Sequence, residues 1–315
     1  AQASEPETRK WYAPADNALI IAGDVDAKSI VQKLKTLSYM TPSVQSQKRP
    51  AYEWMQSDSA AYVIVHDPSL SLSEVRFSWK APRVPDKFVG TIQPYIQKLY
   101  LSQLGEIAVA RVKSRLADEG IPYASVSYAH YSSSDGAGDE VFTVATAAGA
   151  SSAEKVMNVM AETMSSLESA GPGRDEFEIA RRQYVRKLNK SISRPVKSNS
   201  DYLDLCMRSF LYGAPLANEA DVLKVYTSRS VDVDTERQLL VEVADALLDP
   251  QKNLLVECRT PSAMQRSVAE NLFREAWDRG KTVAAPASLS VSDTLLTVSS
   301  APKVGVKVPK KDHIS

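Results

Sequence analysis

The chain has 315 residues, a hydrophobic fraction of 43% and equal numbers of basic and acidic residues, 38 of each. This balance creates no strong positive field, so the sequence predicts no nucleic-acid-binding surface. No apolar run approaches the ~20 residues that a helix needs to cross a bilayer, and we expect no membrane segment.

The first elements expected along the chain are a strand and a helix. Residues 18–22 form an uninterrupted apolar run that is typical of a buried strand. Residues 23–25 follow as a turn, and Asp26 is suited to cap a helix over residues 27–37. The positions of that helix expected to face a core are Ile30, Val31, Leu34 and Leu37.

The passage from Trp11 to Asp26 carries a family resemblance. Its Trp-Tyr-Ala-Pro start, Asn17, the apolar run and the Gly-Asp-Val-Asp end resemble the WY-x-P-x-N-(apolar)-G-D-V-D passage of the pitrilysin/insulinase-type (M16-like) zinc peptidases. The mitochondrial processing peptidases belong to the same family. There the passage closes the zinc-bearing first domain. The resemblance therefore implies that residues 1–45 are the closing segment of a preceding domain that is absent from this chain.

A long helix is expected within residues 87–117. Pro94 suits a first turn, so the regular helix is expected to begin at Gln93 or Pro94, and Gly120 ends it. One apolar stripe at helical spacing is expected to face the core, with Gln103 off it. The stripe consists of Ile92, Ile96, Leu99, Tyr100, Leu104, Ile107, Val112 and Leu116.

Strand-like segments lie on both sides of this helix. Residues 62–65 and 75–79 precede it, and residues 124–128 and 141–145 follow it. We expect Trp79 to be buried against the stripe of the long helix. Two strands, a helix, two strands and then more helices indicate an α+β fold with two layers, in which helices pack on a mostly antiparallel or mixed sheet.

The rest of the chain is expected to add helices and a closing strand. These are helices over residues 153–167, 175–188, 201–212 and 235–248, a strand over residues 254–258, and a short helix near residues 268–277. Segments 112–128 and 171–188 again resemble the peptidase family, in the second domain of bacterial members that carry both halves in one chain. The resemblance implies that residues 46–261 are a complete non-catalytic domain and residues 262–315 a connector toward the second half.

The chain lacks the zinc motif of that family. Family members hold zinc with two histidines of an H-x-x-E-H helix and a distal glutamate. The three histidines, His66, His130 and His313, are far apart and none belongs to such a motif. We expect His66 to be exposed or bonded to the backbone, and His130 to be half-buried with its polar atoms satisfied. No catalytic residue, metal ligand or cofactor is therefore expected in this chain, whereas the resemblance implies zinc in the parent protein.

Two further sets of residues carry expectations. The family's fourth domain uses an R-x6-Y motif in substrate binding, and Arg115 and Tyr123 stand at the corresponding place here with seven residues between them. Because the domain and the spacing both differ, we favour a structural role for this pair over substrate binding. Cys206 and Cys258 lack metal-ligand spacing and have apolar neighbours, and we expect two buried free thiols.

By resemblance, the chain is a non-catalytic domain of a zinc metalloendopeptidase, inactive alone, that helps to wall a chamber for peptides. Two alternatives stay open: an inactive family member with an assembly role, comparable to the core subunits of the respiratory complex, and a free-standing peptide-binding domain. The expected partners are the other domains of the parent chain, peptide substrates, and a second copy bound through residues 1–45, where the strand at residues 18–22 leaves backbone groups unpaired. The likeness to fused bacterial members is the only indication of a compartment, the periplasm.

Overall fold

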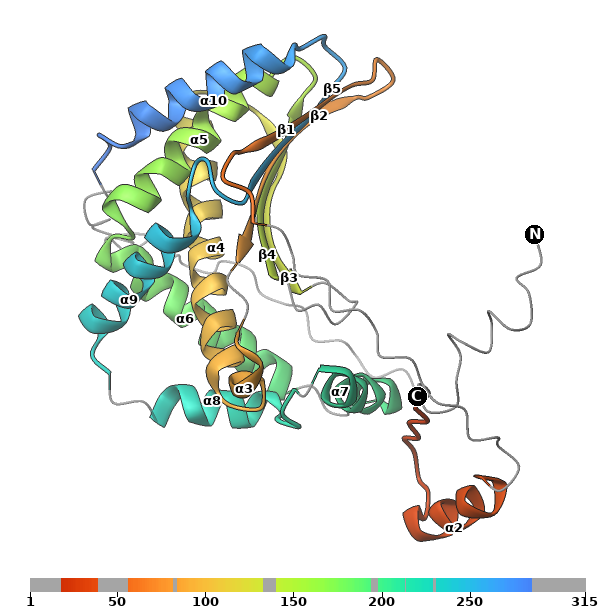
Figure 1. Cartoon of the computed structure of the whole chain (residues 1–315). Helices are drawn as coiled ribbons and strands as arrows, with labels where there is room; N and C mark the ends of the chain where they lie inside the picture. The colour runs from red at the N-terminus through yellow and green to blue at the C-terminus, as the bar shows by residue number, and fades with distance from the viewer. Residues whose placement is uncertain are drawn as a thin grey trace, which may run out of the picture.

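One five-stranded sheet, covered by helices on a single face, organises the protein (Figure 1). The computed structural model describes residues 18–38, 56–81, 84–132, 140–193, 198–212, 214–228 and 231–284. The strands are β1 (Ala61–His66), β2 (Leu72–Ala81), β3 (Tyr123–Ser132), β4 (Glu140–Gly149) and β5 (Leu254–Thr260). These strands confirm the five segments expected from residue 62 onward, and the two-layer α+β fold is confirmed as well.

The helices of the described residues largely follow the expected pattern. They are α2 (Ala27–Ser38), α3 (Asp86–Val89), α4 (Gln93–Asp118), α5 (Ala153–Ala170), α6 (Arg174–Ile192), α7 (Asn199–Tyr212), α8 (Glu219–Ser228), α9 (Val233–Leu247) and α10 (Arg266–Gly280). Helix α4 carries Pro94 in its first turn, as expected. Helices α3 and α8 were not predicted, because each is too short to show a sustained apolar period.

The strand order is β1-β5-β2-β4-β3, and the sheet is mixed. Strand β1 runs parallel to β5, whereas β5 and β2, β2 and β4, and β4 and β3 are antiparallel. Strand β5, which comes late in the chain, therefore lies between the first two strands. Strands β1 and β3 form the two edges.

Strand β2 buries the residues that the alternation indicated. Val75, Phe77 and Trp79 are fully buried on the face that the helices cover. The ring of Trp79 packs against Phe142 of β4 and Trp277 of α10, with centroids 6.4 and 6.5 Å away. Helix α4 lies mainly over β3 and β4. Trp79 is buried as expected, and its contact with the stripe of α4 stays a prediction.

Helix α4 buries most of the expected stripe, with two differences. Ile92 stays exposed just before the helix, at the mouth of a pocket. Gln103 was expected on the solvent-exposed side of the helix, but it is only 1% exposed. It faces the packed helices, where it hydrogen-bonds Tyr226 of α8. Gly105 allows α4 to approach the sheet closely, since a Cβ there would lie 2.2 Å from the ring of Tyr128 on β3.

The expected strand at residues 18–22 is wrong. The segment is irregular, and Leu19 is 68% exposed. Helix α2 does form, and the carboxylate of Asp26 caps it by accepting from the backbone N–H groups of Lys28 and Ser29, both at 3.2 Å. The strand is not formed because, within the described residues, no strand lies beside the segment to pair with it. The rest of the Trp11–Asp26 motif, residues 11–17, lies outside the described residues.

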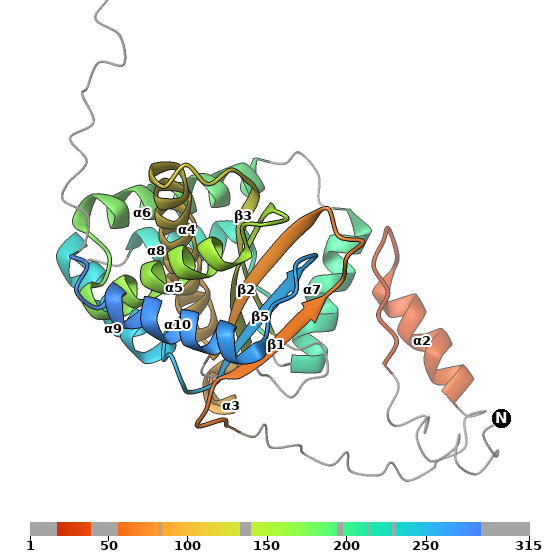
Figure 2. The ribbon, with the colours of Figure 1, turned by 90° about the horizontal axis from the view of Figure 1, so that it is seen from above.

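Two helices lie apart from the two layers. Helix α2 exposes Val31, Leu34 and Leu37, the apolar face that was expected to be buried. Helix α7 likewise exposes a group of large apolar side chains, of which Phe210 is 64% exposed. Figure 1 shows both helices beyond the lower end of the sheet, and Figure 2 shows α2 apart from the rest of the fold.

Helix α10 belongs to the packed core. Its residues Ala269, Phe273, Ala276 and Trp277 are buried, and Figure 2 shows the helix lying beside α5 over the sheet. The ring of Phe273 packs edge-on against Phe77 of β2, with centroids 5.2 Å apart. The core therefore includes residues that the family resemblance assigned to the connector. The division into segments 1–45, 46–261 and 262–315 stays a prediction.

Candidate functional site

Among the described residues, no helix packs on the second face of the sheet, which we call the open face. Strand alternation and pairing register place the side chains of this open face in rows that cross all five strands. In the order β1, β5, β2, β4, β3, these rows are Val65, Arg259, Glu74, Ala147, Ser125; then Val63, Glu257, Arg76, Ala145, Ser127; and then Ala61, Leu255, Ser78, Thr143, Ala129.

The rows divide the open face into three bands. In these three rows, strands β3 and β4 carry only small side chains, which we call the small-residue band: Ser125, Ser127, Ala129, Thr143, Ala145 and Ala147. Strands β2 and β5 carry charges, and Arg76 contacts Glu74 at 2.5 Å and Glu257 at 3.8 Å. Strand β1 presents the exposed Val63 and Val65. Another chain is thus able to approach the backbone most closely over the small-residue band.

The described histidines are engaged in local contacts. The Nε2 atom of His66 lies 3.0 Å from the carbonyl oxygen of Pro261, at the exposed end of β1. The Nε2 atom of His130 lies 2.9 Å from Oε2 of Glu140, which also accepts from Gln97 of α4 at 2.8 Å. Both positions confirm the expected local roles. His313 lies outside the described residues.

The described residues do not fit the zinc site of a peptidase. His66 and His130 lie on different strands, and each already has an oxygen partner. Nowhere in the described part of the chain do three His, Cys, Asp or Glu residues group in a way that suits a metal ion. Within the same residues, no helix is both long and apolar enough to cross a membrane.

Arg115 and Tyr123 occupy separate structural positions. Arg115 lies near the end of α4 and pairs with Glu162 of α5, which also accepts from Arg279 of α10 at 2.7 Å. Burial alone would raise the pKa of Glu162, but the hydrogen bonds from Arg279 and Arg115 outweigh it and lower the pKa. Tyr123 begins β3 opposite Ala148 and is exposed. These contacts give Arg115 a role in joining three helices, whereas substrate binding by the pair stays an untested hypothesis.

The two cysteines differ from each other. Cys258 is buried in β5, and burial raises the pKa of its thiol to about 11. Cys206 is exposed on α7. The expectation of two buried thiols is therefore correct for Cys258 and wrong for Cys206, because α7 does not pack into the core.

An unpredicted polar centre joins the helical layer. Arg111 of α4 is buried and forms a two-pronged ion pair with Glu176 of α6, at 2.8 Å from Nε and 2.7 Å from Nη2. The guanidinium also donates to Oγ of Ser166 at 3.1 Å and to the carbonyl oxygen of Gly171 at 2.8 Å. Gly171 has a positive φ of +68°, which ends α5 and separates it from α6. Arg111 therefore fixes three helical segments.

Comparison with known proteins decides the family. Residues 8–184, more than half of the chain, match the family described as the peptidase M16 inactive domain. The chain belongs to this family. Among curated proteins, no sequence matches the chain. The M16 inactive-domain assignment agrees with the resemblance noted in the passage from Trp11 to Asp26.

Several solved structures resemble the chain at low identity. The periplasmic protease PqqL from Escherichia coli superposes with a TM-score of 0.67 at 14% identity, over 89% of this chain and 31% of PqqL. The peptidase M16 inactive domain from Pseudomonas fluorescens gives 0.53 at 12% identity, over 77% of this chain and 53% of that one. A chain of Complex III2 from Candida albicans gives 0.53 at 12% identity, over 80% and 57%. This M16 chain thus spans about a third of PqqL and about half of the other two.

The missing ligand motif leads to a first prediction. The purified chain is expected to hold no stoichiometric zinc and to cleave no peptide, because zinc needs about four clustered ligands. Metal analysis after dialysis, with a general peptide substrate as the activity assay, measures both. About one tightly held zinc per chain, lost on His66→Ala or His130→Ala substitution, would contradict the prediction.

Proposed function

We propose that the chain is the non-catalytic domain of a zinc metalloendopeptidase and that its open sheet face helps to wall a peptide-binding chamber. The zinc of such an enzyme is bound by a domain outside this chain, which this domain would face. The peptide substrates and the remaining domains of the parent chain are the partners that this role requires.

The small-residue band is the observation that carries the proposal. A bound peptide in extended form presents backbone groups along its whole length, so it needs a surface that it can approach without large side chains in the way. Strand β3 suits such a peptide for two reasons. It is an edge strand, so one side of its backbone has no neighbouring strand within the sheet. Its open-face residues Ser125, Ser127 and Ala129 are also small and exposed. The adjacent charges of β2 and β5 would give such a surface polar contacts for side chains of either sign.

Blocking the band tests the role directly. We expect Ser127→Trp, at the centre of the band, to weaken binding of a fluorescein-labelled unstructured peptide to the purified chain by about tenfold or more, since the indole occupies the approach to the backbone. Fluorescence anisotropy measures the change. Tryptophan is well tolerated on an exposed strand position, so the variant is expected to fold.

A matched control places the same side chain on the opposite layer. Lys113→Trp lies on the exposed side of α4, away from the open face, and is expected to leave peptide binding unchanged. Equal losses in the two variants, or no peptide binding by the unaltered chain, would contradict the chamber-wall role. The second result would favour the assembly role instead.

A further inference from the structure

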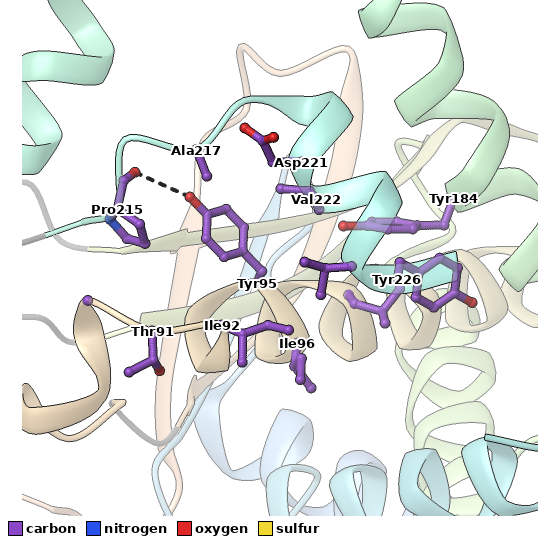
Figure 3. A pocket seen from close by; sticks show the side chains of 13 residues that line it. Thr91, Ile92, Tyr95, Ile96, Tyr184, Pro215, Ala217, Asp221, Val222 and Tyr226 are labelled. Carbon is purple, nitrogen blue, oxygen red and sulfur yellow. Dashed lines mark hydrogen bonds between the residues drawn. The ribbon is translucent and has the colours of Figure 1, made fainter. Parts of the chain in front are cut away.

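A pocket lies in the helical layer, on the side of the sheet opposite to the open face. It has a volume of about 270 Å³ and is formed by the start of α4, by α6 and α8, and by the segments that precede α4 and α8. Figure 3 shows its side chains, with Ile92 and Ile96 on one wall and Val222 of α8 on another. The neighbouring Val225 of α8 also lines it.

The lining is apolar and offers no positive charge. None of the described residues that line the pocket is basic, and Asp221 is the charged one among them. The carboxylate of Asp221 accepts from the backbone N–H of Asn218 at 3.0 Å, while the side chain of Asn218 accepts from the N–H of Asp221. These two hydrogen bonds hold the Asp221 carboxylate at the start of α8. The lining thus offers no cation to pair with an anionic ligand, and a neutral ligand fits the pocket best.

Three tyrosines lie around the pocket, and Tyr184 is the one whose hydroxyl has no hydrogen-bond partner among the described residues. Tyr95 donates to the carbonyl oxygen of Pro215 at 3.4 Å. The hydroxyl of Tyr226 points away from the pocket and accepts from Arg181 at 3.0 Å. The ring of Tyr184 packs edge-on against Tyr226, with centroids 5.9 Å apart, and its hydroxyl points into the pocket, where no described residue is its hydrogen-bond partner (Figure 3).

The Tyr184 hydroxyl is a donor at neutral pH. Burial, with smaller contributions from Tyr226 and Tyr128, raises the pKa of Tyr184 to about 12. The proton therefore stays on the oxygen, and a half-buried donor that faces an apolar space gains from an acceptor in that space.

We propose that this pocket binds a neutral, mostly apolar small molecule whose single oxygen acceptor receives a hydrogen bond from Tyr184. The pocket volume limits the size of the ligand. A cavity of about 150 Å³ accommodates benzene, and one of about 270 Å³ has room for a fused two-ring system with a small substituent. The site is separate from the open sheet face and independent of the chamber-wall role.

A pair of ligands of equal shape tests the proposal. The probes are 2-acetylnaphthalene and 2-isopropenylnaphthalene, which differ in a carbonyl oxygen against a methylene group. Ligand-observed NMR titration of the purified chain is expected to show about two- to tenfold tighter binding of the ketone. Tyr184→Phe is expected to remove this preference while the alkene binds as before.

Two further variants locate the site. Val225→Trp fills the pocket from a position that is 37% exposed and is expected to abolish binding of both probes. Val268→Trp, at an exposed position of α10 away from the pocket, is expected to leave both affinities unchanged. Circular dichroism checks folding, and if Val225→Trp unfolds, Ile92→Trp at the exposed mouth replaces it. Failure of both probes to bind, undiminished binding to the filled variant, or a ketone preference that survives Tyr184→Phe would overturn the proposal.

Discussion

Replacement of Arg111 by leucine is expected to lower the free energy of unfolding by about 3–5 kcal/mol. The leucine fills most of the space but leaves the carboxylate of Glu176 in a largely buried site without its cation. It also removes the hydrogen bonds from Arg111 to Ser166 and to the carbonyl oxygen of Gly171, which hold the connection between α5 and α6 against α4. Urea denaturation followed by far-UV circular dichroism measures the loss.

Two comparison variants separate the ion pair from general damage to α4. Lys113→Leu, two residues further along the same helix, changes an exposed charge and is expected to alter stability by less than about 0.5 kcal/mol. The double substitution Arg111→Leu with Glu176→Leu is expected to recover much of the loss, because no charge is then left unpaired. An Arg111→Leu variant within about 1 kcal/mol of the unaltered chain would show that the pair does not hold the helices together.

Truncation of Trp79 to alanine is expected to cost about 3–5 kcal/mol. The side chain is fully buried and its ring packs between Phe77 and Phe142 of the sheet and Trp277 of α10, so its loss leaves a cavity between the two layers. Its indole N–H also donates to the carbonyl oxygen of Asp249 at 3.0 Å, which would lose its partner. The same denaturation experiment measures the effect.

Trp277 supplies a matched control for the hydrogen bond. It is buried beside Trp79, but its indole N–H has no partner among the described residues. Replacement by phenylalanine removes a similar volume at either position, so Trp79→Phe is expected to cost about 1 kcal/mol more than Trp277→Phe. Equal losses would mean that the bond to Asp249 contributes nothing, and a small loss in Trp79→Ala would mean that the layers repack around the gap.

The elements of the fold were predictable where a local pattern reports burial. Alternation along residues 75–79 and the three-to-four spacing around Leu104 each indicate a buried side, and the structure confirms that Val75, Phe77, Trp79 and Leu104 are buried. The neighbours of each element were not predictable in this way. Nothing in the period of β5 indicates that it lies between β1 and β2, and nothing in the period of β2 indicates that Trp79 packs against Trp277 of α10.

The polar and ligand-binding features depend on contacts between distant residues. A charged residue such as Arg111 is ordinarily solvated, and its partner Glu176 lies 65 positions along the chain. The pocket needs the short helix α8, which carries no strong sequence signal. The small-residue band is composed of ordinary Ser, Thr and Ala residues, and it emerges only from the register of β3 against β4.

The parallel pairing of β1 with β5 has a consequence for how the protein is made. Residues 61–66 pair with residues 254–260, so they have no partner until the ribosome has added about 190 further residues. At about 5–20 residues per second, that delay is roughly 10–40 s. During this time β2 can join β4 and β3, but the other edge of β2, with its apolar residues, stays open. The nascent chain is therefore most exposed to misassociation, and most in need of chaperone protection, just before β5 arrives.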